Sequence, residues 1–207
     1  MIKFPNNKKY RDSKSFFKDY SIALKDTLLR MDYQKLDKIY EILNKTIKKR
    51  GQIFVAGNGG AASVSNHFLC DFNKGVKISS EKKLMPKVIS LSSSIETITA
   101  ISNDLSYEKI FSFQLENYIQ KNDCLFVMSC SGTSKNILNV IKFCKKKNIK
   151  IIYVTGFLKK KPNYKVDVHL NLNCKNYGIT EDIFSSIMHM ISQFIRQDSS
   201  KKINQTL

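Results

Sequence analysis

Five polar residues of this sequence stand at the spacings that catalytic or metal-binding helices use. His67 and Asp71 are four residues apart, and Glu181, Ser185 and His189 follow one another at the same interval. Residues four apart lie on the same face of a helix, so each group projects from one side of its helix. The two helices could supply up to four nitrogen and oxygen ligands for zinc. Alternatively, they could supply an acid–base pair with its orienting partners.

Two loops rich in glycine and serine each follow a short apolar run. In the first loop, residues 57–60 (GNGG), three glycines allow tight turning and close approach of the backbone to a ligand. The second loop, 129–134 (SCSGTS), carries four hydroxyls and a glycine at a predicted helix start, where free N–H groups favour an anion. Capping by Thr133 or Ser134 would use one hydroxyl. The remaining hydroxyls favour a cradle for a phosphate monoester, and neither loop matches the nucleotide patterns GxxxxGK[ST] or GxGxxG.

Short apolar runs alternate with helical patterns from residue 51 onward. The runs are rich in β-branched residues and apolar on both faces, which is typical of a parallel sheet covered on both sides. We therefore expect an α/β fold, a flavodoxin-like three-layer sandwich with a five-stranded parallel sheet. The predicted strands are 52–56, 87–91, 124–129, 150–155 and 166–172, and the predicted helices are 60–72, 94–103, 106–119, 134–147 and 180–196.

The chain reads as one domain with an N-terminal extension. Amphipathic patterns over 15–29 and 33–49 predict that residues 1–50 form a helical hairpin, which packs on the domain or on another subunit. Residues 51–197 would form the α/β domain and 198–207 a polar tail. Ligands of such sheets bind at the carboxyl ends of the strands, where the two loops lie. The third histidine, His169, falls inside the last predicted strand and is interpreted as structural.

The charge of the chain is strongly positive. Lys and Arg number 35 against 17 Asp and Glu, giving a formal net charge of +18. A nucleic-acid binder would have such a balance, but four arginines give little of the bidentate recognition that phosphates and bases favour. We interpret the lysine runs, such as 145–147 and 159–161, as a lysine-rich surface whose field attracts an anionic substrate. Nucleic acid is therefore not an expected partner.

The five cysteines favour a reducing compartment. They are odd in number, widely spaced and free of any CxxC pair, so we expect free thiols in the cytoplasm and no disulfide framework. No apolar run approaches the ~18 residues of a membrane span, and the first residues lack the apolar block of a signal peptide. We expect no membrane association.

Taken together, the motifs resemble the SIS (sugar isomerase) family, and specifically its bacterial phosphoheptose isomerases. The match extends over about residues 50–196. The stretches that carry it are 57–60, 66–68 with Asp71, 97–104 (TITAISND), 129–134 and 178–189 (GITEDIFSSIMH).

The resemblance implies a role for individual residues. Catalysis would fall to Asp71 and His189, and one zinc ion per subunit would be held by His67, Asp71, Glu181 and His189. Asp71 stands where the family has a glutamate, and Glu181 where it has a glutamine. The implied substrate-binding residues are Asn58, Gly59, Gly60, Asp71, Asn103, Asp104, Ser129, Cys130, Ser131, Ser134 and Glu181.

The implied activity is interconversion of a ketose phosphate and an aldose phosphate through an enediolate. For this family the reaction is sedoheptulose 7-phosphate to D-glycero-D-manno-heptose 7-phosphate, carried out by a homotetramer. Two alternatives stay open: a non-catalytic SIS protein that binds a protein partner, and an isomerase of another sugar phosphate. The presence of His189 together with Glu181 favours an enzyme, because a binding protein needs no acid–base pair.

Overall fold

The computed structural model describes residues 1–5, 8–81, 83–158 and 165–199. The α-helices are α1 (Ser13–Leu29), α2 (Tyr33–Lys48), α3 (Gly60–Cys70), α4 (Lys77–Ser79), α5 (Ile95–Asp104), α6 (Ser112–Glu116), α7 (Lys135–Lys146) and α8 (Tyr177–Ser199). A π-helical turn η1 (Asp71–Val76) joins α3 to α4, and a 3₁₀ turn η2 (Tyr107–Lys109) precedes α6. The strands are β1 (Ile2–Lys3), β2 (Gln52–Ala56), β3 (Lys87–Ser90), β4 (Cys124–Ser129), β5 (Lys150–Thr155), β6 (Val168–Asn171) and β7 (Cys174–Lys175).

The main sheet has five parallel strands in the order β3-β2-β4-β5-β6, which confirms the predicted sheet. Within this sheet the chain enters at β2, continues to β3 at one edge, and then returns to β4 on the other side of β2. The loops that leave β2 and β4 therefore separate toward opposite faces, and this switch point is where open α/β sheets bind ligands. The loop 57–60, called the glycine loop below, leaves β2, and the loop 129–134, called the hydroxyl loop, leaves β4.

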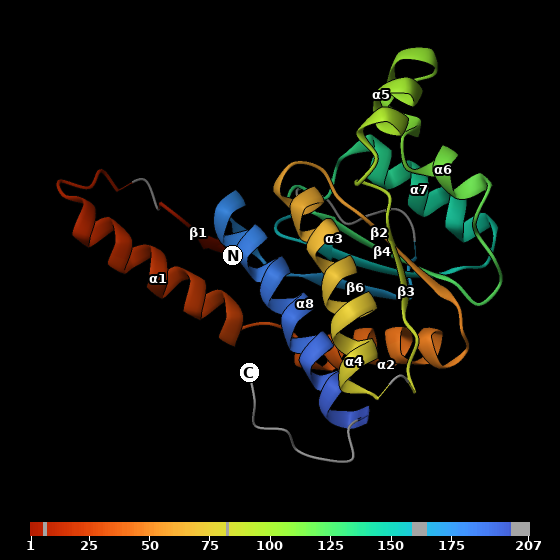
Figure 1. Cartoon of the computed structure of the whole chain (residues 1–207). Helices are drawn as coiled ribbons and strands as arrows, with labels where there is room; N and C mark the ends of the chain where they lie inside the picture. Colours follow the sequence, from red (N-terminus) through yellow and green to blue (C-terminus); the bar gives the residue numbers. More distant parts are fainter. Residues whose placement is uncertain (6–7, 82, 159–164, 200–207) are drawn as a thin grey trace.

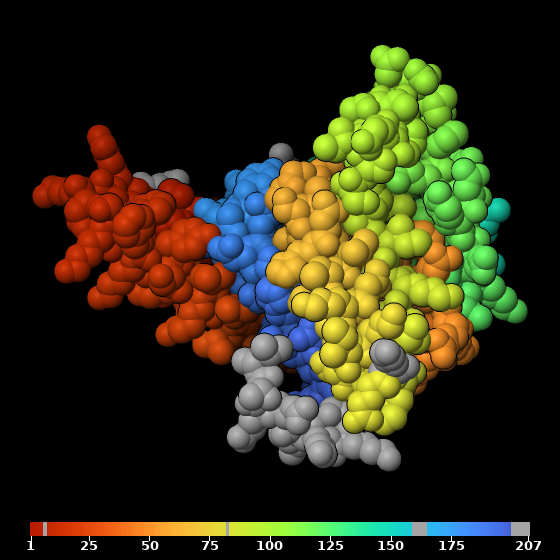
Figure 2. All heavy atoms as spheres, viewed as in Figure 1, coloured from red at the N-terminus to blue at the C-terminus, as the bar shows by residue number. Residues whose placement is uncertain are grey.

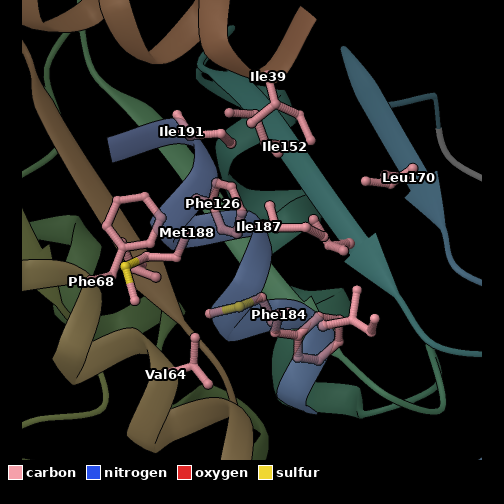
Figure 3. Packing of buried hydrophobic residues seen from close by; sticks show 14 of the residues in the cluster. Ile39, Val64, Phe68, Phe126, Ile152, Leu170, Phe184, Ile187, Met188 and Ile191 are labelled. Atoms are coloured by element: carbon pink, nitrogen blue, oxygen red, sulfur yellow. The ribbon is translucent and has the colours of Figure 1, made fainter. Parts of the chain in front are cut away.

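Two hydrophobic cores lie on the two faces of the sheet and confirm the three-layer arrangement. One core joins the sheet to α2, α3 and α8, and the other joins it to α5, α6 and α7 (Figure 1). Figure 3 shows the first core, in which Phe68 of α3 and Met188 of α8 approach Phe126 of β4. The Phe68 and Phe126 ring centroids are 5.2 Å apart. This packing clamps α3 against α8 and so fixes the helices that carry the predicted catalytic residues.

The N-terminal helices begin and end close to the predicted bounds. Asp12 and Asp32 cap α1 and α2 by accepting backbone N–H groups of the first turns. The helices do not pack chiefly on each other as a hairpin would. Instead, α1 contacts α8, where the Tyr20 hydroxyl donates to Asp182 at 2.7 Å, and α2 packs on the sheet. Figure 2 shows α1 extending from the body as an arm.

Several predicted boundaries were wrong. The helix expected over 106–119 is split into η2 and α6, and the break allows the adjacent Ile110 and Phe111 both to enter the second core. The last helix continues to Ser199, so residues 198 and 199 are helical rather than part of a tail. The pairing of β1 with β7 was not predicted, because two-residue strands leave no pattern. The rest of the predicted tail (200–207) and the lysine run 159–161 lie outside the described residues.

Within the part of the chain that the structure describes, no helix is both long and apolar enough to cross a membrane.

Candidate active site

His67, Asp71 and His189 come together where α3 and η1 pack on α8. One carboxylate oxygen of Asp71, Oδ1, lies 3.6 Å from His67 Nε2, and the other, Oδ2, lies 3.6 Å from His189 Nε2. The two imidazole centroids are 5.0 Å apart. Asp71 is mostly buried, with 19% of its side chain exposed, whereas the two imidazoles are 51% and 41% exposed. The cluster therefore faces solvent on its histidine side, where a substrate has access.

The donor set of this cluster fits zinc. The ligand atoms of His67, Asp71 and His189 all lie within 4.8 Å of one another. Two ligands that each lie 2.0–2.2 Å from a tetrahedral zinc ion are roughly 3.4 Å from each other. The two 3.6 Å imidazole–carboxylate separations are close to this value. Two imidazoles, one carboxylate and an open position would also match the pattern of catalytic zinc sites.

Asp71 lies at a change of helix type. It is the first residue of the π-helical turn η1, directly after the last residue of α3. Such turns add one residue to a helical turn and occur frequently at functional sites. Sequence reasoning expected one continuous helix over 60–72 and gave no sign of this turn.

Glu181 lies apart from the histidine cluster. Its carboxylate is next to Gly60, where a Cβ would come within 2.2 Å of Glu181 Oε2. The Cys130 thiol lies 3.8 Å from Glu181 Oε1 as a donor. Burial, and secondly the Glu181 charge, raise the pKa of Cys130 to about 12, so this thiol stays protonated at neutral pH. The predicted role of Glu181 as a fourth zinc ligand is not part of this arrangement and stays a prediction.

The hydroxyl loop borders a cavity of about 110 Å³ at the carboxyl end of β4. Gly132 has φ +67°, which permits the turn, and its N–H donates to Ser129 Oγ at 3.2 Å. Ser129 Oγ and Ser134 Oγ are 3.4 Å apart, so their hydroxyls face a common space. The cavity is lined by Asn58, Met128, Ser129, Cys130, Ser131, Ser134, Tyr177 and Glu181. Six of these eight residues were predicted to bind substrate, and the structure brings those six together.

The glycine loop is tied to α7 by paired side-chain amides. Asn58 and Asn136 each donate their Nδ2 hydrogens to the other's Oδ1, at 2.9 and 2.8 Å. The Tyr107 hydroxyl also donates to Asn58 Oδ1, at 2.9 Å. Gly59, at φ +56°, turns the chain into α3, and Gly60 is its first residue. Sequence reasoning missed Asn136, Tyr107 and Tyr177, because their approach depends on long-range packing.

Asn103 and Asp104 are not brought into this cavity. They end α5, are exposed, and are joined by a 2.9 Å hydrogen bond from Asn103 Nδ2 to Asp104 Oδ1.

The third histidine lies away from the site, in β6, where His169 Nε2 is 2.9 Å from Thr155 Oγ1. Burial, followed by the charge of Lys35, lowers the pKa of His169. Both observations suit the structural role predicted for this residue.

Comparison with known proteins identifies the family. The family model described as the SIS domain matches residues 16–156. A phosphoheptose isomerase of Aliarcobacter butzleri is 30% identical over 167 residues, which cover 81% of this chain and 87% of that protein. The chain belongs to the SIS-domain family, in its phosphoheptose isomerase branch. Another phosphoheptose isomerase, from Thermodesulfovibrio yellowstonii, is 26% identical over 84% of this chain and 86% of its own.

Solved structures of the family share the fold. A phosphoheptose isomerase from Francisella tularensis has a TM-score of 0.79 and 23% identity, with 89% of this chain and 96% of that chain covered. A second, from Neisseria gonorrhoeae, has a TM-score of 0.76 and 21% identity, covering 89% and 97%. These likenesses place the three-layer α/β architecture among the SIS folds.

Proposed function

We propose that this chain isomerises a sugar phosphate, converting sedoheptulose 7-phosphate to D-glycero-D-manno-heptose 7-phosphate through an enediolate. Membership of the phosphoheptose isomerase branch supports the reaction class. The observation that carries the proposal is the convergence of Asp71 and His189, whose Oδ2 and Nε2 atoms are 3.6 Å apart although 118 positions of sequence separate the residues. That placement would give one carboxylate and one imidazole to a common reacting centre.

The reaction requires a proton to move between two neighbouring carbons. A base removes a proton from C1 of the ketose, and the C1–C2 enediolate forms as the carbonyl oxygen gains negative charge. A proton is then delivered to C2, O1 loses its proton and O2 gains one, which leaves the aldehyde at C1 and a hydroxyl at C2. Asp71 and His189 would carry these transfers, since carboxylates and imidazoles are suited to general acid–base work near neutral pH. The mostly buried Asp71 is held in place, while the more exposed His189 can reach the substrate.

The hydroxyl loop would hold the phosphate. Ser129, Ser131 and Ser134 line the cavity together with Asn58. Gly60 and His67 are seven residues apart on α3, about 10 Å along the helix axis. Gly60 lies next to Glu181, which lines the cavity, so the proposed phosphate pocket and the histidine cluster would form two ends of a site suited to an elongated substrate. Binding energy from the unreactive phosphate end would fix the reacting carbons near Asp71 and His189.

Zinc is the proposed cofactor. His67, Asp71 and His189 would hold it, and Glu181 remains a predicted fourth ligand. When bound, zinc acts as a Lewis acid on the substrate carbonyl. Asp71 and His67 would then orient the site, and the partly exposed His189 would face the substrate.

We further propose a homotetramer in the cytoplasm. The exposed apolar side chains of α1, such as Phe17 (64%) and Leu29 (66%), support burial of this helix against other subunits. All five cysteines are free thiols, which supports a reducing compartment. Size-exclusion chromatography with light scattering tests the assembly, and a monomer at working concentration would contradict it.

The activity is tested by incubating the purified protein with sedoheptulose 7-phosphate and following aldose formation by NMR. Pentose and hexose ketose phosphates serve as competing substrates, each with and without chelator. The proposal expects the heptose to have the highest kcat/KM and chelator to suppress turnover. Preference for another ketose phosphate would replace the substrate, and inactivity on all of them would favour a non-catalytic SIS protein.

A further inference from the structure

Arg196, in the last turns of α8, is the one Lys or Arg side chain that forms an ion pair with Asp71 among the described residues. Its Nη2 donates to the Asp71 backbone carbonyl at 3.3 Å and lies 4.0 Å from Asp71 Oδ1. The side chain is 22% exposed, and its buried Nε has no hydrogen-bond partner within the described part of the chain. Withdrawing a guanidinium from water costs free energy, so its largely buried position beside Asp71 indicates a structural role.

Gly75, in η1, leaves room for this guanidinium. A Cβ at position 75 would lie 1.8 Å from Arg196 Nη2 and 2.6 Å from its Cζ. Gly75 is not among the residues with positive φ, so its backbone conformation does not require glycine. Glycine inside a helix is less favourable than alanine. The close approach of the guanidinium is therefore the physical reason for glycine at this position.

The contacts around Asp71 are divided between its two oxygens. His67 and Arg196 approach Oδ1, at 3.6 and 4.0 Å. His189 approaches Oδ2 at 3.6 Å, and Ser192 donates to the same oxygen at 3.4 Å. The cation on the Oδ1 side, together with the bond to the main-chain carbonyl, holds both the backbone and the carboxylate of Asp71. Its Oδ2 is thereby directed at His189.

We propose that Arg196 is a positioning residue for the isomerisation, which fixes Asp71 at the start of η1 and directs its Oδ2 toward His189. Arg196 does not touch the substrate in this proposal and acts through Asp71. The inference rests on the proposed function for its kinetic consequence. Its structural part, the placement of Asp71 between two histidines, can be measured without turnover.

Three variants separate positioning from general stability. Arg196→Gln removes the cation but keeps a hydrogen-bond donor, and Arg196→Lys retains the charge. Gly75→Ala leaves Arg196 in the chain but displaces its guanidinium, while alanine favours the helical backbone. The matched control is Gln197→Ala, at the exposed neighbouring position of the same helix.

For Arg196→Gln and Gly75→Ala we expect kcat to fall about 10²-fold, as for an ångström-scale misplacement of a catalytic group. KM should change less than about threefold, because the phosphate pocket is untouched. Arg196→Lys should recover part of kcat, and Gln197→Ala should match the wild type. Wild-type kcat in Gly75→Ala, or kcat losses that only follow the folded fraction measured by circular dichroism, would overturn the proposal.

Two further readouts keep the proposal testable if the wild type turns over none of the sugars. Zinc affinity, measured by competition with a chelating dye, should fall about 10-fold or more in Arg196→Gln and Gly75→Ala, as when an outer partner of a ligand is lost. The imidazole ¹⁵N resonances of His67 and His189 in the metal-free protein should also shift in both variants. If the protein isomerised no sugar phosphate, the changes in zinc affinity and in the imidazole resonances would still be expected. Unchanged zinc affinity and unchanged resonances would refute the role of Arg196.

Discussion

The hydroxyl loop and the histidine cluster are built in opposite ways. The loop takes its serines from six consecutive residues, 129–134, at the end of one strand. The cluster takes His67 and Asp71 from one segment and His189 from a helix near the end of the chain. A local turn and one glycine bring the hydroxyls of the loop together, although other elements complete the cavity. The second requires α3 and α8 to be packed together by the core. The hydroxyls of the proposed phosphate pocket are thus brought together locally, whereas the proposed catalytic cluster depends on tertiary packing.

The largest expected effect comes from the non-local region. His189→Ala should lower kcat by about 10²–10⁴-fold, the usual contribution of a general acid–base group. Its fold should persist, because the imidazole is 41% exposed and lies outside the hydrophobic core. Steady-state kinetics and circular dichroism measure the two properties.

The matched control for this variant is Met190→Ala, the neighbouring partly exposed residue of α8. It should retain wild-type kcat. Equal turnover in His189→Ala and the wild type would remove His189 from the mechanism, and the histidine cluster would then have no catalytic role through this residue.

A smaller and different effect is expected in the local region. Ser131→Ala removes one hydroxyl from the cavity, and a hydrogen bond to a charged group is worth about 1.5–3 kcal/mol. KM should therefore rise about 10- to 100-fold while kcat changes little. Ser21→Ala, which removes an exposed serine hydroxyl of α1, serves as the control. A fall in kcat at constant KM would contradict the assignment of this loop to phosphate binding.

The same division explains what the sequence could predict. The strands and the 129–134 loop were recognisable because their patterns are local, and the pairing of His67 with Asp71 followed from helical spacing. That His189 joins this pair was one possibility raised by the spacings on the two helices, and the family resemblance implied it. The Asn58–Asn136 amide pair and the approach of Arg196 to Asp71 gave no signal, since each depends on residues brought together by tertiary packing.

For Asn103 and Asp104 the sequence predicted a substrate contact that the structure does not show. Their place in a family motif predicted substrate contact, but the structure leaves them exposed at the end of α5. Their assignment stays a prediction, and the motif alone does not bring them to the cavity.

The smallest expected effect distinguishes the sheet histidine from the helical ones. Burial lowers the pKa of His169 below the ordinary 6.5, so the unfolded chain binds its proton more readily. The stabilising contribution is therefore present above pH 6.5 and is lost as the pH falls below it. Urea unfolding at pH 7.5 and pH 5.5 should show a larger loss of stability for the wild type than for His169→Gln.

His67 and His189 are common to both of these proteins, so the difference between the two losses isolates His169. Identical losses in the wild type and His169→Gln would contradict the lowered pKa. Isomerase activity at pH 7.5 should be similar in the two proteins, since His169 lies outside the site.

The most direct measurement follows the hydrogen that moves between C1 and C2. The wild-type protein is incubated with sedoheptulose 7-phosphate in D₂O, and the product is examined by NMR. Proton transfer through Asp71 and His189 predicts deuterium at C2 of the aldose phosphate, and His189→Ala should form almost no labelled product. Turnover with the original C1 hydrogen fully retained at C2, or equal labelling by His189→Ala, would contradict the account.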